Sequence, residues 1–223
     1  MQSQIQNDTT LADLAVRHAG ASRVFHRHGL DFCCNGRVSL EDACRKSDLN
    51  LAAITSELEA AIAETPQDSP ITEAALPVFV EYILENFHAA HREEVPRLIG
   101  MARKVEQVHG DKPDCPKGLA AFLEHMSEEL EMHMQKEEQI LFPMIVGGRG
   151  AMTGMPISVM ENEHQDHGKN LQRLRNLVNN YVPPEGACNT WRALYLGLEQ
   201  LERDLMEHIH LENNSLFPRA LKS

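Results

Sequence analysis

The sequence predicts an all-α protein, in which an up-down-up-down bundle of four long helices follows a small helical N-terminal domain. Stretches rich in Ala, Leu, Glu and Met dominate the 223 residues, and no alternating β-branched run with hairpin turns interrupts them. Three segments that contain Gly and Pro divide the C-terminal part into four long amphipathic stretches. Long helices with short connections are typical of antiparallel bundles.

Proline and serine positions give the expected boundaries of these elements. The polar residues 66–70 predict a linker between a helical module, residues 1–65, and the bundle, residues 71–223. Ser69 followed by Pro70 predicts a helix start, and Ser39-Leu-Glu-Asp predicts another inside the module. The bundle helices are expected near residues 71–109, 117–146, 158–181 and 188–221, and Ser158 is the expected N-cap of the third.

Composition excludes several classes of protein. Lys plus Arg is 21 and Asp plus Glu is 33, so the net charge of −12 argues against binding nucleic acid or an anionic membrane. No apolar run is long enough for a membrane span, and the first residues do not resemble a secretory signal. The 5 cysteines are an odd number and imply no disulfide framework. We therefore expect a cytoplasmic protein with reduced thiols.

The four bundle helices are two copies of one helical hairpin. A His-x3-Glu pair followed by Leu-Phe-Pro begins at His133 in the second helix and again at His208 in the fourth. A His-x2-His pair begins at His88 in the first helix and again at His164 in the third, with nearly the same offset along the chain. The sequence therefore predicts a pseudo-two-fold bundle in which each half offers the same side chains to a shared centre.

The repeated His and Glu residues lie on the apolar stripes of their helices, where the spacing of three and four predicts Leu. A single His on such a stripe is more often a satisfied core residue. An ionised Glu in a dry bundle costs several kcal/mol, however, and no Lys or Arg shares this layer. Six polar positions in one layer therefore predict bound metal, with these ligands: His88, His133, Glu137, His164, His208 and Glu212.

The number and type of ligands indicate the metal. Two cations that share both carboxylates would each hold two imidazoles, and an oxo or hydroxo bridge would leave one open position on each. Imidazole and carboxylate without thiolate suit iron or manganese better than structural zinc. His91 and His167 could be additional ligands or hydrogen-bonding neighbours of the centre. Glu129 and Glu163 could orient the imidazoles or lie on a solvated helix face. His125 and His210 fall off the stripes and are expected at the surface.

A pair of adjacent cysteines, Cys33 and Cys34, lies in the segment Asp31-Phe-Cys-Cys-Asn-Gly of the small module. Adjacent thiols cannot form an unstrained disulfide. The pair could contact a metal, carry out redox or nitric-oxide chemistry, pass a metal to a partner, or be a buried structural pair. The other three cysteines are isolated in the sequence.

These motifs together resemble the iron-sulfur cluster repair di-iron proteins, a family with a ScdA-type Cys-Cys module before a hemerythrin-like bundle. The resemblance covers essentially the whole chain. It implies that the six predicted ligands hold two non-haem, carboxylate-bridged iron ions. It also implies a cytoplasmic, homodimeric stress protein that restores clusters damaged by nitric oxide or peroxide. Oxygen-carrying hemerythrins differ, because their last helix carries His-x4-Asp where this sequence has His-x3-Glu.

Three functions are compatible with these features. The first is an iron donor that relays labile iron past Cys33 and Cys34 to iron-sulfur proteins with damaged clusters. The second is an enzyme that reduces nitric oxide to nitrous oxide at the iron pair, where two nitrosyls would lie close together. The third, and least favoured, is a reversible sensor or carrier of oxygen or nitric oxide.

Overall fold

This computed structural model describes residues 5, 6, 8–64 and 70–223, which form helices joined by turns and loops. Within these residues the one β contact is an isolated bridge between Thr10 and Ser39. The prediction of an all-α protein is therefore confirmed. The chain forms two compact units, one containing residues up to 80 together with 206–223 and the other residues 81–205. None of the described helices is long and apolar enough to cross a membrane.

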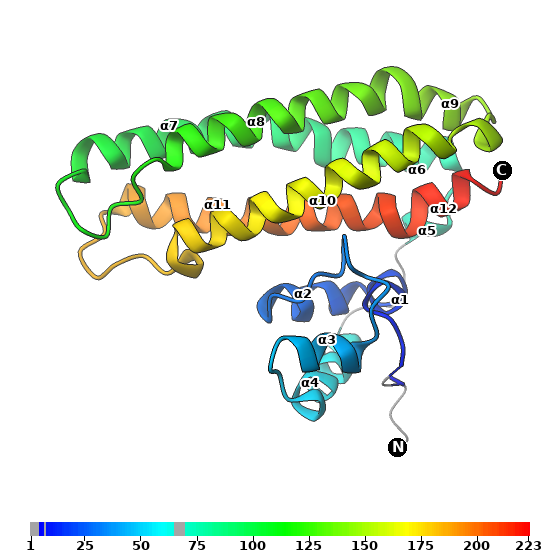
Figure 1. Ribbon diagram of the computed structural model, residues 1–223, viewed down its shortest axis with the longest axis horizontal. Helices are drawn as coiled ribbons and strands as arrows, with labels where there is room; N and C mark the ends of the chain where they lie inside the picture. The colour runs from blue at the N-terminus through cyan, green and yellow to red at the C-terminus, as the bar shows by residue number, and fades with distance from the viewer. Residues whose placement is uncertain (1–4, 7, 65–69) are drawn as a thin grey trace. The chain divides into compact units, whose positions relative to one another are not determined.

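The N-terminal module consists of four short helices, α1 (Leu11–Arg17), α2 (Ala19–Arg27), α3 (Leu40–Lys46) and α4 (Leu51–Glu64) (Figure 1). The Ser39 hydroxyl accepts a hydrogen bond from the Asp42 amide at 3.1 Å, which confirms the predicted start of α3. Thr10 caps α1 in the same way. The core of this module contains the fully buried side chains of Phe25, Leu40 and Leu58.

Close packing of the loop between α2 and α3 explains the glycine that comes shortly after the cysteine pair. A Cβ atom on Gly36 would lie 2.4 Å from the Phe32 carbonyl oxygen and 2.8 Å from the Ala12 Cβ. Only glycine allows the loop to approach α1 so closely. The amide of Ala12 also donates a 2.8 Å hydrogen bond to the Gly36 carbonyl, which fixes the loop against the helix.

Four long helices lie side by side in Figure 1: α7 (Ala89–His109), α8 (Leu119–Lys136), α10 (Gly154–Leu177) and α11 (Asn189–Leu211). They are joined by short connections, as an up-down-up-down bundle requires. Gly197 of α11 faces Leu98 of α7 so closely that a Cβ atom would lie 2.6 Å from a Leu98 methyl group. The absence of a side chain at this position therefore brings the two helices together.

Three π-helical turns interrupt the long helices that the sequence predicted as continuous: η1 (Leu84–His88), η2 (Glu137–Leu141) and η5 (Glu212–Leu216). The short helices α9 (Phe142–Val146) and α12 (Phe217–Ala220) come directly after the last two turns. In each π turn a backbone amide donates to the carbonyl five residues earlier, as Phe142 does to Glu137. A π turn adds one residue to the helical repeat and is often found at functional sites.

The structure corrects two further boundaries. The first predicted bundle helix is divided into α5 (Pro70–Glu73) and α6 (Leu76–Ile83) before η1 begins. The third begins at Gly154, so the prediction of Ser158 as its N-cap was wrong; the cap position is Thr153, and the early Pro156 is tolerated in the first turn. The predicted linker and the Ser69 cap fall on residues 65–69, outside the described residues.

The third bundle helix also ends earlier than expected. It stops at Leu177 and leads into the short turn η4 (Asn179–Tyr181), with η3 (Gly150–Met152) preceding the helix at its other end. The residues of η4 have φ angles between 48° and 61°, in the left-handed region. Two asparagines begin this turn, and asparagine tolerates such angles better than most side chains.

Candidate metal centre

The predicted ligands from the first hairpin are buried and close together. His88 ends the π turn η1, His133 lies in the last turn of α8, and Glu137 begins the π turn η2. Their exposed fractions are 1%, 1% and 0%. The Glu137 carboxylate lies 3.4 Å from the Nε2 atom of His88 and 3.5 Å from the Nε2 atom of His133. One carboxylate thus faces two imidazoles.

The second hairpin offers the same types of side chain. His164 of α10 is fully buried, and its Nε2 atom lies 3.0 Å from that of His133. His208 of α11 has its Nε2 atom 3.2 Å from the carboxylate of Glu212, which begins the π turn η5. Both of these residues are fully buried.

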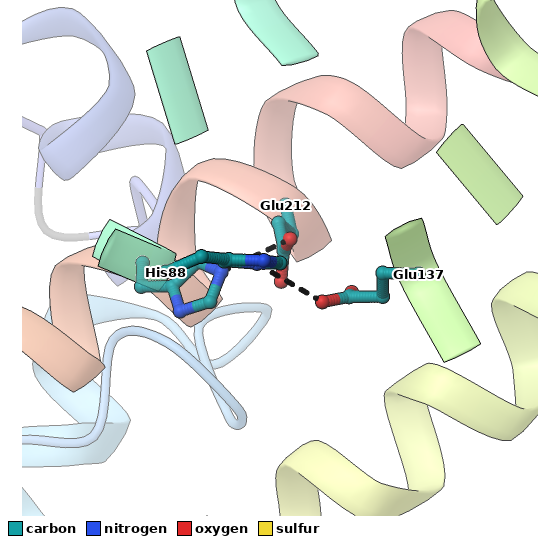
Figure 2. Close-up of side chains that lie close together, drawn as sticks. His88, Glu137 and Glu212 are labelled. Atoms are coloured by element: carbon teal, nitrogen blue, oxygen red, sulfur yellow. Dashed lines mark hydrogen bonds and ion pairs between the residues drawn. The ribbon is translucent and has the colours of Figure 1, made fainter. Parts of the chain in front are cut away.

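Two groups of ligand atoms result, and within each group all atoms lie within 4.8 Å of one another. Figure 2 shows His88 with its ring nitrogen directed to the carboxylates of both Glu137 and Glu212. The two carboxylates belong to both groups, whereas each imidazole belongs to one. The groups are His88, Glu137, His208 and Glu212, and His133, Glu137, His164 and Glu212.

The chemistry of this donor set fits non-haem iron. Two carboxylates with no exposed surface carry a charge that burial penalises strongly unless a cation lies beside them. Imidazole nitrogen and carboxylate oxygen are the ligands of carboxylate-bridged metal pairs in four-helix bundles. Each of the two groups supplies two imidazoles and the same two carboxylates, and each could hold a metal ion.

A carboxylate that the sequence analysis did not single out orients His88. The Nδ1 atom of His88 lies 2.8 Å from Glu138, which also receives a 2.7 Å hydrogen bond from Arg92. Arg92 donates two further hydrogen bonds to Glu131, and these carboxylates raise its pKa. This chain of contacts fixes which nitrogen of His88 faces the centre, the usual task of an outer partner of a metal-binding histidine.

Glu163 has the same relation to His133. Its carboxylate lies 3.0 Å from the Nδ1 atom of His133 and accepts a hydrogen bond from Lys136. These two partners, His133 first, lower the pKa of Glu163 to about 2. The carboxylate therefore stays ionised at neutral pH and holds the His133 ring with its Nε2 atom toward the centre.

The other three residues considered near the centre have different surroundings. Glu129 accepts a 2.7 Å hydrogen bond from Asn170 and pairs with His125 at 3.3 Å. The ring of His167 meets the ring of His133 edge-on, with centroids 5.0 Å apart. His91 is buried beside Phe87, with ring centroids 6.4 Å apart.

A cavity of about 170 Å³ opens between α8 and α10 beside these outer residues. Glu129 and Glu163 line it together with Lys136 and His167. Asp166 adds a third carboxylate to the wall. A small polar molecule or a cation can therefore reach His167 and the carboxylates of this wall.

The cysteine loop is organised by Asp31. Its Oδ1 atom accepts a 2.9 Å hydrogen bond from the Cys34 amide and a 3.3 Å bond from the Cys33 thiol. The two sulfur atoms are 3.6 Å apart and form no disulfide, and together with the Asp31 carboxylate they could hold one metal ion. The Cys34 thiol, burial and the Asp31 charge hold the pKa of Cys33 well above its ordinary value. A cation that binds here must therefore displace a proton.

The π turn η5 joins this loop to the helix that carries His208. Asn213 donates a 3.0 Å hydrogen bond to the Cys33 carbonyl, and Asn214 donates a 3.3 Å bond to the Phe32 carbonyl. The prediction of His210 at the surface was wrong, because its ring packs on Phe32 at 5.3 Å and is 1% exposed. Burial lowers the pKa of His210 to about 4.

Comparison with known proteins identifies two domains in the chain. Residues 80–220 match the hemerythrin HHE cation binding domain, and residues 7–62 match ScdA_N, a domain of unknown function (DUF542). The iron-sulfur cluster repair protein YtfE of Pectobacterium atrosepticum is 51% identical over 215 residues, 96% of this chain and 97% of the relative. The protein of the same name from Yersinia pseudotuberculosis is 49% identical over 213 residues, 96% of each chain.

Proposed function

Since the chain belongs to the hemerythrin-like iron-sulfur cluster repair proteins of the YtfE type, we propose that it repairs iron-sulfur clusters damaged by nitric oxide or peroxide. In this proposal it binds two non-haem iron ions and donates iron to the damaged protein. The proposed ligands are His88, His133, Glu137, His164, His208 and Glu212.

The observation that carries the proposal is the sharing of Glu137 and Glu212 between two groups of ligand atoms. A resident structural cation is usually enclosed by its own four ligands. Two cations that depend on the same two carboxylates repel each other, so the loss of the first is easier than the loss of an isolated ion. This arrangement supports the release of one iron ion as cargo.

The cysteine loop offers the released iron ion a second binding site. We propose that Cys33 and Cys34, with Asp31, receive a ferrous ion and pass it to the damaged iron-sulfur protein. Asn213 supports this proposal, because it belongs to the π turn that begins at Glu212 and holds the Cys33 carbonyl. The high pKa of Cys33 keeps this thiol protonated until a cation arrives.

A reactivation assay tests iron donation. An iron-sulfur hydratase inactivated by nitric oxide is mixed with the iron-loaded protein under anaerobic conditions, and its activity is recorded over time. We expect recovery with the iron-loaded protein and none with protein that a chelator has stripped of metal. Equal recovery with the same amount of free ferrous salt would contradict a specific role for the protein.

A Cys33→Ala, Cys34→Ala variant tests the thiol route separately. Its iron content is expected to stay unchanged, because the bundle ligands are intact, while the rate of reactivation falls at least about 10-fold. Nitrous oxide in the headspace after addition of nitric oxide to the reduced protein would instead support turnover at the metal centre. That reaction would survive the double substitution.

Two further properties belong to the proposal, namely a cytoplasmic location and assembly as a homodimer. Light scattering of the purified protein tests the second, for which we expect about twice the 25.1 kDa mass of the chain. A monomer at micromolar concentration would remove the dimer from the proposal without affecting iron donation.

A further inference from the structure

A second thiol site lies far from the proposed metal centre. It is formed where the connection from η4 reaches the start of α11, beside the end of α7, and Figure 1 shows these loops gathered at one end of the long helices. The 21 residues of α7 separate His109 from His88, a rise along the helix of about 30 Å. The chemistry of this end is therefore independent of the metal ligands.

The site is a cysteine-histidine pair with a fixed geometry. The Sγ atom of Cys188 lies 3.2 Å from the Nε2 atom of His109, and both residues are partly exposed. The His109 ring packs in a tilted arrangement against Trp191, which has no exposed surface, with centroids 5.4 Å apart. A nucleophile beside a base whose ring is held by a third group is the arrangement of activated thiols.

The backbone around Cys188 is also held in place. Its carbonyl accepts the first hydrogen bond of α11, from Arg192 at 3.0 Å, so Cys188 occupies the N-cap position of a helix of 23 residues. Lys112 donates to the Gly186 carbonyl, and the Arg192 guanidinium donates to the carbonyls of Glu185 and Ala187. The thiol thus lies at the positive end of a helix dipole, and two cationic side chains are bound to its own loop.

From this geometry we propose that Cys188 is a site of mixed-disulfide formation with small disulfides such as oxidised glutathione. The Cys188 thiol passes its proton to His109, and its sulfur attacks one sulfur of the disulfide. The attacked sulfur-sulfur bond breaks as the new one forms, and the departing thiolate takes the proton back from His109. Cys188 is oxidised, the departing thiol is reduced, and no other reactant is needed.

Two other cysteines serve as internal references. Cys44 is 1% exposed and Cys115 is 7% exposed, and burial raises the pKa of both thiols. Cys44 and Cys115 are both buried, whereas Cys188 is partly exposed and contacts a histidine. We therefore expect oxidised glutathione to modify Cys188 well before either of them.

The test measures the rate of glutathionylation in the full-length, iron-loaded protein at pH 7. Peptide mapping by mass spectrometry records the mass increase at each cysteine, and a synthetic peptide of residues 183–193 gives the rate of the same thiol without the fold. We expect Cys188 in the protein to react about 10-fold faster than in the peptide, a cautious figure for a positioned base.

A His109→Phe variant keeps an aromatic ring against Trp191 and removes the base. Its rate at Cys188 should fall to within about 3-fold of the peptide, with an unchanged circular dichroism spectrum. A rate in the protein no faster than in the peptide would overturn the proposal, and so would a folded variant that reacts as fast as the original protein. The comparison with the peptide needs no variant and decides the matter if His109→Phe does not fold.

Discussion

The two π turns of the repeat, η2 and η5, begin with equivalent glutamates and differ at the next position. After Glu137 comes Glu138, whose carboxylate holds the Nδ1 atom of His88. After Glu212 comes Asn213, whose amide instead donates to the Cys33 carbonyl. The same backbone turn therefore orients a histidine in one hairpin and holds the cysteine loop in the other. The two halves of the repeat therefore carry the same candidate ligands, but they differ in the residue that follows the glutamate.

The largest effect should come from the glutamate that begins a turn. Substitution of Glu137 by Ala removes an oxygen ligand from both groups of ligand atoms, so we expect bound iron to fall by at least half. Elemental analysis of the purified protein measures this. Glu128→Ala, an exposed position on the preceding helix α8, is the matched control and should retain its iron. Full iron content in Glu137→Ala would contradict the proposed ligand set.

Removal of the metal should lower stability. A ligand present at about 100 times its dissociation constant stabilises a protein by about 2.7 kcal/mol. For a chain of this size, that corresponds to a fall in Tm of about 5–10 °C after chelation. Calorimetry with and without chelator gives the shift, and readdition of ferrous iron should reverse it. If the stripped protein melted at the original temperature, the buried carboxylates would not need a cation.

The outer partner of His88 should affect iron affinity. Glu138→Ala leaves the Nδ1 atom of His88 without its acceptor, and loss of such a partner usually weakens metal binding about 10- to 100-fold. Asn213→Ala, at the equivalent position of the other turn, should change affinity less than about 3-fold. Competition with a coloured chelator measures both. Equal effects of the two substitutions on iron affinity would contradict the proposed difference between the two π turns.

The smallest effect should appear at the cysteine loop. Asn213→Ala removes one hydrogen bond to the Cys33 carbonyl, and such a bond contributes about 1 kcal/mol. The loop should then open about 5-fold more often, and alkylation of Cys34 should accelerate by the same factor. Glu138→Ala should leave that rate unchanged. Mass spectrometry after brief exposure to iodoacetamide measures the rate in both variants.

Much of the fold could be predicted because the signals for it are local. Helical spacing and the Gly- and Pro-bearing segments located the four long helices, and the apolar stripes predicted that six His and Glu side chains would be buried. His210 was placed wrongly for a physical reason: stripe analysis assumes one buried face for each helix. Another face of α11 meets Phe32 of the N-terminal module, and no local pattern reports a contact between segments so distant in the sequence.

The π turns and the outer carboxylates were missed for different reasons. A π turn adds a single residue to the repeat, which is too small a change to see in a stripe of three- and four-residue spacings. Glu138 comes directly after a predicted ligand, and a helical wheel of constant period places it to one side. Its partners His88 and Arg92 both come from the first bundle helix, and a pattern within one helix does not report contacts with another.

Each π turn amounts to a one-residue insertion, with a consequence for everything downstream. Deleting one residue such as Gln139 would restore an ordinary α-helix and rotate the remainder of that helix by about 100° about its axis. Phe142, which now stacks on the His88 ring with centroids 5.7 Å apart, would swing away and leave the imidazole uncovered. The one extra residue therefore sets the orientation of Phe142 relative to the candidate ligands His88 and Glu137.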